Sequence, residues 1–166
     1  MSDNGNPLHV FRFQVDFYVS TEGASARGTR QTLCSGRFSQ CSGLEATMDV
    51  QQIKVGGGNY GAVQRAGRVS FATVVLRRGL TRTDHLWRWF ELLGTGGYAY
   101  RLDADVSVLG HSNNESPVMV WTMRRALPTK FRAAELDAKS NEVGVEELQF
   151  VHEGLSLEMI GEASGA

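Results

Sequence analysis

Residues 69–97 read VSFATVVLRRGLTRTDHLWRWFELLGTGG, and this stretch sets one strand directly before one helix. In Val69–Leu76 both alternating series are apolar or small, which predicts a central strand that is covered on both faces. Four large apolar side chains then follow helical spacing over about 83–93: Leu86, Trp89, Phe90 and Leu93. The stretch therefore predicts a sheet that carries one main helix.

The ends of that helix are marked by residues that favour helix termini. Gly79 is expected to end the strand, and Thr81 or Thr83 is expected to cap the helix by accepting a backbone N–H bond. The glycine-rich run 94–97 is expected to stop the helix.

Period-two patterns on both sides of this stretch predict further strands. In Phe11–Val19 apolar side chains alternate with polar ones, as in a half-buried strand. The other predicted strands are Phe38–Ser42, Ala46–Ile53, Tyr98–Leu109, Val118–Arg125, Val143–Phe150 and Leu155–Met159. The fold class predicted is mainly β: a small antiparallel β-barrel or sandwich with one main α-helix at about 83–93.

The segments between these strands predict the irregular parts of the chain. Residues 20–36 are expected to form a long loop or loose hairpin. Leu127-Pro128 is expected to break the strand pattern, and 131–138 to form a short helical turn. A slip in phase within 143–150 predicts a bulge in that strand.

The length of 166 residues predicts one domain, with a disordered N-terminus at 1–8, a single domain at 9–160 and a flexible C-terminus at 161–166. The net charge of −1 argues against general nucleic-acid binding. The charge is uneven, however, because the segment from Ala133 onward carries −7 and the rest carries +6. This split is typical of a solvated acidic face, or of an acidic face that meets a basic one on a neighbouring subunit.

The first residues have no basic region followed by an apolar one, so no signal peptide is predicted. No apolar run approaches the ~20 residues that span a bilayer, so we expect no membrane segment and synthesis in the cytoplasm. Cys34 and Cys41 fit no zinc or redox spacing, which favours two free thiols.

Three patterns in the sequence are candidates for chemistry, and none predicts catalysis. Residues 56–61, GGGNYG, match the glycine spacing of a dinucleotide loop, but a strand is expected after them where that site needs a helix. Asp103 and Asp105 share one strand face, as an acid and base pair or, more simply, as a solvated polar face. The four histidines are scattered, with no metal spacing. We predict no enzyme, no cofactor and no metal.

Taken in order, several short motifs resemble the contractile phage tail tube protein family, the inner tube proteins of phage tails and of extracellular contractile injection systems. The motifs are Phe38…Cys41-Ser42-Gly43-Leu44, Gly56-Gly57-Gly58-Asn59, Leu76-Arg77-Arg78-Gly79-Leu80-Thr81, Leu86-Trp87-Arg88-Trp89, Trp121, Ala126, Pro128, Lys130, Asn141-Glu142-Val143, Glu146, Leu148, His152, Gly154 and Leu155. The resemblance covers about Val10 to Met159.

This resemblance implies a structural subunit that forms hexameric rings with a continuous lumen barrel. The rings would stack into a rigid hollow tube that sheath contraction propels and that passes protein or DNA cargo. The implied partners are other copies of the chain, a sheath protein, a baseplate hub or tube initiator and a terminator cap. The implied location is a virion or phage tail-like particle.

Two sets of residues are expected to make contacts between subunits. The glycine-rich loop 54–65 supplies Lys54, Gly56, Gly57, Gly58, Asn59 and Tyr60. The charged strands supply Arg77, Arg78, Glu146 and Glu147. The alternatives are a monomeric β-barrel that binds a ligand and a type VI-like secreted ring protein.

Overall fold

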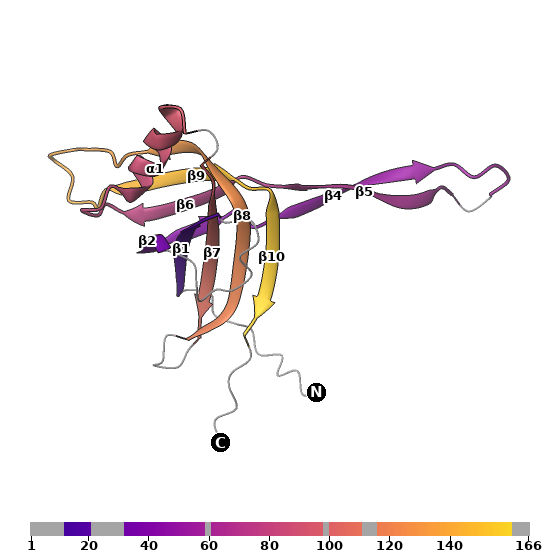
Figure 1. Ribbon diagram of the computed structural model, residues 1–166, viewed down its shortest axis with the longest axis horizontal. Coiled ribbons are helices and arrows are strands. Elements are labelled where there is room, and N and C mark those ends of the chain that lie inside the picture. The colour runs from indigo at the N-terminus through magenta and orange to yellow at the C-terminus, as the bar shows by residue number, and fades with distance from the viewer. Residues whose placement is uncertain (1–11, 21–31, 59–60, 98–99, 111–115, 161–166) are drawn as a thin grey trace, which may run out of the picture.

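The computed structural model describes residues 12–20, 32–58, 61–97, 100–110 and 116–160 (Figure 1). The predicted tails at 1–8 and 161–166 lie outside the described residues. Within them the chain is mainly β with one helix, which confirms the predicted fold class. The elements are β1 (Phe13–Val19), β2 (Thr32–Arg37), β3 (Gln40–Ser42), β4 (Ala46–Ile53), β5 (Val63–Phe71), β6 (Val74–Gly79), α1 (His85–Gly94), β7 (Leu102–Leu109), β8 (Pro117–Arg132), β9 (Val145–Val151) and β10 (Gly154–Met159).

Strand β8 joins two halves of the main antiparallel sheet. The strand order is β2-β1-β7-β8-β9-β6-β3, and β10 pairs with the first part of β8 on the side opposite β7. The first part of β8 lies in the lower half of the sheet with β2, β1, β7 and β10, while its last part lies in the upper half with β9, β6 and β3. In Figure 1 β7, β10 and the first part of β8 run nearly vertically, and β6 and β9 run across above them.

The bend in β8 lies where the strand passes from one half to the other. Arg125 has a positive φ of 53°, and the register shifts again between Pro128 and Lys130. The predicted break at Leu127-Pro128 is therefore wrong, because a β-bulge accommodates the proline and the strand continues. The predicted helical turn at 131–138 is also wrong, since β8 runs to Arg132 and no helix follows. The predicted bulge in 143–150 falls on the partner strand β8 instead.

The core lies between the two halves, and α1 packs over it. Trp89 of α1 lies with its ring centroid 5.2 Å from that of Phe17 and 6.3 Å from that of Phe150. Phe17 and Phe150 meet edge to face at 5.9 Å. Leu86 and Leu93 are also buried, so the helical spacing seen in the sequence marks the core face of α1.

The helix begins and ends close to the predicted residues, but its N-terminal cap differs. Asp84 occupies the cap position and makes no side-chain cap hydrogen bond, so the predicted cap by Thr81 or Thr83 is wrong. Asp84 instead pairs with Arg88 at 2.7 Å. At the other end Gly97 N donates to the Leu92 carbonyl at 3.0 Å, as expected where glycines follow a helix.

The predicted central strand Val69–Leu76 is two strands with a break at Ala72-Thr73. Only the second piece lies within the main sheet, between β3 and β9, with Val74 and Leu76 fully buried. Val69 is 42% exposed, so the prediction of two covered faces is wrong for the first piece. The predicted loop 20–36 also contains part of a strand, β2, while its residues 21–31 lie outside the described part.

Candidate assembly surfaces

Two acidic residues of β9 lie directly opposite two arginines of β6. The register pairs Arg77 with Glu147 and Arg78 with Glu146. Because neighbouring residues of a strand point to opposite faces, the two ion pairs lie on opposite faces of the upper half. The structure thus brings these four predicted contact residues together within one chain, and their contact with a neighbouring subunit stays a prediction.

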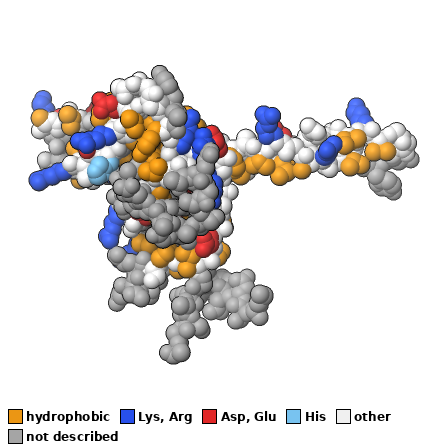
Figure 2. All heavy atoms as spheres, in the orientation of Figure 1, with side chains coloured by type: hydrophobic (Ala, Val, Ile, Leu, Met, Phe, Trp, Pro, Cys, Tyr) orange, Lys and Arg blue, Asp and Glu red, His pale blue; other side chains and the backbone are white. Residues whose placement is uncertain are grey.

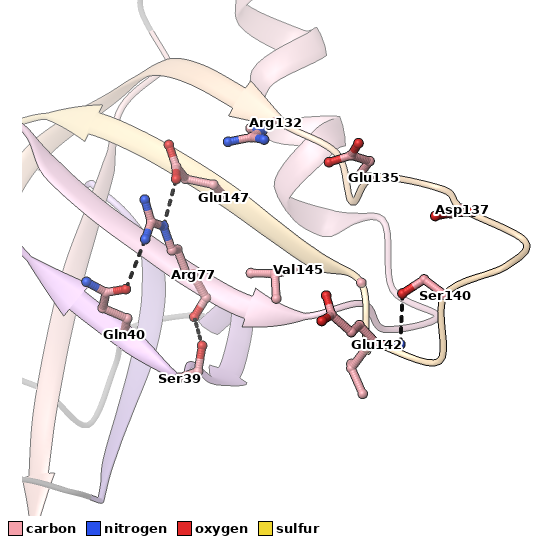
Figure 3. A pocket seen from close by; sticks show the side chains of 12 residues that line it. Ser39, Gln40, Arg77, Arg132, Glu135, Asp137, Ser140, Glu142, Val145 and Glu147 are labelled. Carbon is pink, nitrogen blue, oxygen red and sulfur yellow. Dashed lines mark hydrogen bonds and ion pairs between the residues drawn. The ribbon is translucent and has the colours of Figure 1, made fainter.

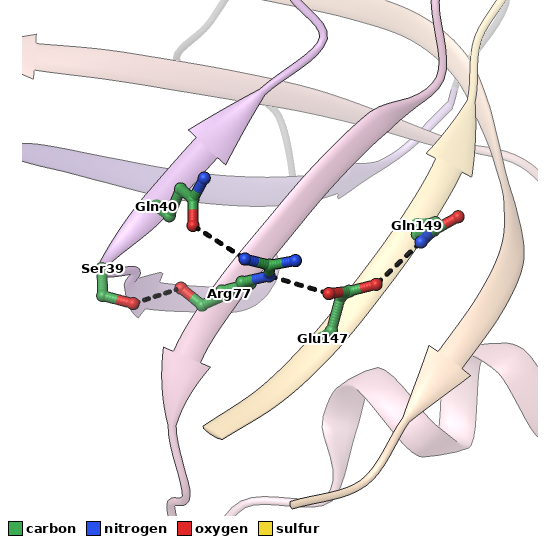
Figure 4. A network of polar contacts seen from close by, with 5 residues as sticks. All are labelled: Ser39, Gln40, Arg77, Glu147 and Gln149. Carbon is green, nitrogen blue, oxygen red and sulfur yellow. Dashed lines mark hydrogen bonds and ion pairs between the residues drawn. The ribbon is translucent and has the colours of Figure 1, made fainter. Parts of the chain in front are cut away.

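The outer pair sits in a polar network that spans three strands (Figure 4). Arg77 Nε lies 2.7 Å from Glu147 Oε2, and Arg77 Nη1 donates to Gln40 Oε1 at 3.2 Å. Gln149 Nε2 donates to the other Glu147 oxygen at 2.7 Å. The hydrogen bonds from Gln149 and then Arg77 lower the pKa of Glu147, because they stabilise its charged form.

The inner pair is enclosed by the protein. Arg78 and Glu146 are 4% and 6% exposed, and Arg78 Nε donates to Glu146 Oε1. The guanidinium carbon of Arg78 also lies 5.5 Å from the ring centroid of Phe38. Arg78 Nη2 donates to Thr83 Oγ1 at 3.4 Å. Removing one member of such a pair leaves a buried charge without its partner, which is costly.

Strands β4 and β5 form a two-stranded arm that projects from the body (Figure 1). The nine residues of β5 alone span roughly 30 Å at ~3.3 Å per residue. Every residue of β4 is exposed, and only Gly67 and Phe71 of β5 are partly covered. The arm therefore lies almost entirely outside the core.

The two faces of the arm differ in chemistry. The register places Met48 opposite Val69 and Val50 opposite Ala66 on one face. Met48 is 52% exposed, Val69 is 42% exposed and Val50 is 58% exposed. The opposite face carries the polar pairs Thr47 with Ser70 and Gln51 with Arg65. Nearer the tip the pattern reverses, since Gln52 and Gln64 lie on the apolar face and Ile53 and Val63 on the opposite one. Figure 2 shows a hydrophobic band along one side of the arm.

The root of the arm is fixed to the body by close backbone contacts. Gly43 has a φ of +88°, and a Cβ there would lie 2.0 Å from the Thr73 carbonyl oxygen. Ala72 N donates to the Glu45 carbonyl at 3.1 Å. The Phe71 ring stacks 5.0 Å from the buried His152 ring. The arm is thus held at its base and free along its length.

The predicted contact residues of the glycine-rich loop lie at the far end of the arm. Lys54, Gly56, Gly57 and Gly58 follow β4 and are exposed. Asn59 and Tyr60 lie outside the described residues. A strand, β5, follows the loop where a dinucleotide site needs a helix, so the glycine spacing carries no nucleotide chemistry here.

A second surface lies beside the upper half, where the loop 133–144 overhangs β6 and β9 (Figure 3). This hollow has a volume of about 700 Å³. Arg77 and Glu147 lie among its strand residues, and Glu135 and Glu142 come from the loop. Leu136 on the same loop is 88% exposed. The loop side of the hollow is therefore acidic, while Arg77 and Arg132 line its strand side, and an exposed apolar side chain lies on the same loop.

The lower half presents a polar row across its strands. Asp16 of β1 lies opposite Asp105 of β7, which lies opposite Thr122 of β8, and Thr122 lies opposite Ser156 of β10. Since the row crosses four strands in register, all four residues share one face of the sheet.

Asp103 and Asp105 are each only 4% exposed, so the predicted solvated face is wrong at these positions. Thr122 Oγ1 donates to Asp105 Oδ1 at 2.7 Å. Arg125 N donates to Asp103 Oδ1 at 3.0 Å, at the positive-φ bend of β8. Both carboxylates thus satisfy groups of the neighbouring strand, which the alternating sequence pattern did not reveal.

The remaining predictions concern the two cysteines and possible metal ligands. Cys41 is a free, half-buried thiol, as predicted, and burial raises its pKa to about 11. The side chain of Cys34 lies outside the described part. Among described residues, no three His, Cys, Asp or Glu side chains gather as ligands for a metal. No helix in the described ranges is long and apolar enough to cross a membrane.

The sequence matches a known family over most of its length. Residues 9–156 match the family described as T4-like virus tail tube protein gp19. The chain therefore belongs to the tail tube protein family and is a structural tube subunit. No curated protein matches the chain significantly.

Several solved structures are similar to this chain in fold. A chain from the anti-feeding prophage baseplate is 25% identical, with a TM-score of 0.74 over 93% of this chain and 97% of that one. A chain from the sheath–tube complex of the extracellular contractile injection system PVC is 21% identical, with a TM-score of 0.72 over 95% of both chains. An Hcp protein is 12% identical, with a TM-score of 0.53 over 90% of this chain and 99% of that one. The last two similarities show the fold alone.

Proposed function

We propose that six copies of this chain form a ring and that the rings stack head to tail into the inner tube of a contractile injection system or phage tail. Sheath contraction would propel this tube, and protein or DNA cargo would pass through its lumen. The observation that carries the proposal is an open sheet in a member of a tube family.

The open edges of the lower half support ring formation. Within the described residues β2 pairs only with β1, and β10 pairs only with β8. Unpaired strand edges expose N–H and C=O groups that another chain can pair with. Pairing the β10 edge of one copy with the β2 edge of the next would repeat around a ring and close one continuous barrel.

The polar row of the lower half supports the choice of lumen wall. Its members, Asp16, Asp105, Thr122 and Ser156, share one face, while the core residues share the other. We propose that this face turns toward the lumen, because a mainly polar wall lets cargo slide without sticking. In the single chain Asp105 and Thr122 are buried on this face, next to Val120.

The arm supports contacts between rings. The contact residues predicted from the sequence, Lys54, Gly56, Gly57, Gly58, Asn59 and Tyr60, are proposed to reach a neighbouring ring. Deleting residues 56–61 should leave a folded monomer that forms no tubes, because the arm contributes little to the core. Normal tubes from this deletion, seen by electron microscopy, would show that the loop makes no such contact.

The further partners follow from what the similar structures contain. They come from a baseplate, a sheath–tube complex and a tube terminating cap. We propose a sheath protein, a baseplate hub or tube initiator and a terminator cap as partners of this chain as well. We also propose that the chain has no enzymatic activity or cofactor, and that it is made in the cytoplasm before it joins its particle.

Imaging of the purified chain with its baseplate tests the proposal. Negative-stain images should show rings and hollow tubes, and light scattering should show large species. A chain that stays monomeric at high concentration beside its baseplate, and that binds a small ligand in saturable fashion, would support the ligand-binding barrel instead.

A further inference from the structure

We propose that the hollow beside loop 133–144 in one copy receives the arm of another copy. This inference rests on the proposed function, because it names the surface that the arm meets in the assembly. It assigns one occupant to a hollow that the single chain leaves open.

The arm and the hollow lie at opposite ends of the molecule (Figure 1). The arm leaves the body on one side, and the loop between β8 and β9 reaches the other side. A chain cannot place its own arm in its own hollow across this distance. A contact between two different surfaces of identical copies is heterologous, and it propagates from copy to copy into a ring or a stack.

The two surfaces carry matching apolar groups. On the arm, Met48 and Val50 are 52% and 58% exposed on the apolar face. Beside the hollow, Leu136 and Val143 are 88% and 76% exposed. Val143 lines the hollow and Leu136 lies on its loop. Exposed apolar side chains gain free energy when another protein covers them.

The two surfaces also carry opposite charge. Between residues 46 and 71 the arm has three basic residues and one acidic residue, and loop 133–144 has three acidic residues and one lysine. Within the described part of the chain, Lys54, Arg65 and Arg68 form no ion pair, and neither do Glu135 and Glu142. Charges left without partners on both sides are available to each other.

The arm itself needs such a partner. An isolated two-stranded hairpin is marginally stable in water, and both of its edges are open. Among the described residues β4 and β5 pair only with each other. Seating the apolar face against the loop of another copy would supply the cover that the body of its own chain does not.

A charge-reversal experiment tests this pairing. The hollow variant carries Glu135→Lys and Glu142→Lys, and the arm variant carries Lys54→Glu and Arg65→Glu. All four side chains are exposed, so both variants should fold with the melting temperature of the original chain. Glu91→Lys on α1 is the control, because it reverses an exposed charge outside both surfaces.

Each variant alone should need about tenfold or more protein than the original chain to form tubes at low salt, since like charges would face each other at every contact. Mixed in equal amounts, the two variants should form tubes again, because each arm then meets a hollow of opposite charge. The control should assemble normally.

Three outcomes separate the possibilities. Restored tubes in the mixture support the pairing. Normal tubes from each variant alone, or no tubes from the mixture, overturn the pairing of arm and hollow. In that case, tubes formed by the original chain still leave the proposed function standing. An original chain that forms no tubes beside its baseplate contradicts the proposed function and this inference together.

Discussion

The body and the arm are both built from antiparallel strands, but the body buries its large apolar side chains and the arm exposes them. In the body, Phe17 and Phe150 are 1% and 0% exposed, and they meet Trp89 of the helix. In the arm, Met48 and Val50 are 52% and 58% exposed. Burial of apolar surface is the main drive for folding, so the body has its own reason to fold and the arm does not.

This difference indicates what each region is for. A protein that only had to fold would gain nothing from a long exposed hairpin with an apolar face. The body supplies a stable support, and the arm is held at its root by Gly43 and by the stack of Phe71 on His152. The free energy that orders the rest of the arm must come from another molecule.

The largest expected effect concerns the core. Phe150→Ala should lower the free energy of unfolding of the monomer by about 3–5 kcal/mol, because it opens a cavity between the two halves. The matched change on the arm, Val50→Ala, should alter it by less than about 0.5 kcal/mol. Urea unfolding followed by fluorescence measures both. Equal costs would remove the distinction between the two regions.

The next effect concerns the buried ion pair. Glu146→Gln should cost about 3 kcal/mol, since it leaves the Arg78 charge buried without a counterion. The control is Glu147→Gln, which should cost less than Glu146→Gln because its partner Arg77 is 46% exposed and stays in contact with water. Thermal unfolding of the two monomers gives the comparison, and a larger cost for Glu147→Gln would contradict it.

A smaller effect is expected at the bend of β8. Asp103→Ala should cost about 1–3 kcal/mol, because the Arg125 N–H at a positive φ loses its buried acceptor. Asp103→Asn keeps an oxygen acceptor and should cost less. The free energy of unfolding in urea measures both. If the alanine variant is as stable as the original chain, the carboxylate does not hold the bend.

The smallest effect is a pH dependence at the root of the arm. Burial lowers the pKa of His152 below its ordinary 6.5. A hydrogen bond with the Gly154 carbonyl raises the pKa, but this effect is the smaller of the two. The unfolded chain therefore binds the proton first, so stability is full above pH 6.5 and falls as the pH drops through 6.5 toward the folded pKa.

The variant His152→Gln should flatten this dependence between pH 7 and 5, measured by melting temperature at each pH. Glu147 acts in a separate window, because its lowered pKa makes stability fall only below its ordinary 4.5. An unchanged slope between pH 7 and 5 in the variant would show that another group causes it.

Much of the fold could be predicted from local patterns in the sequence. The spacing of Leu86, Trp89 and Leu93 predicted the core face of α1, and alternation predicted β4 at Ala46–Ile53 with its observed bounds. These signals are local, since each element buries or exposes a face at its own period. The order of short motifs across the whole chain predicted the family.

The errors have a common cause in contacts between distant segments. The chain breaks at Ala72-Thr73 because β5 leaves the body with β4, and β8 continues through Pro128 because β9 pairs across the bulge. Asp103 and Asp105 can be buried because Arg125 and Thr122 donate hydrogen bonds to them, which compensates for the lost contact with water. None of these partners is adjacent in sequence.

The candidate assembly surfaces were only partly foreseen. The sequence pointed to the glycine-rich tip but not to the apolar face of the arm, although Met48 and Val50 already alternate with polar residues. The hollow was missed, and the signal was present in Leu136 and Val143 among acidic neighbours. The charges of Arg77 and Arg78 were recognised, but their pairing within one chain depends on the β6–β9 register.

Hydrogen exchange of the backbone amides of β4 and β5, in the monomer and in assembled tubes, tests the central claim most directly. The account predicts fast exchange in the monomer, beside slow exchange in β7 and β8, and strong protection of the same arm amides after assembly. Arm amides that are already protected in the monomer, or that still exchange fast in tubes, would contradict it.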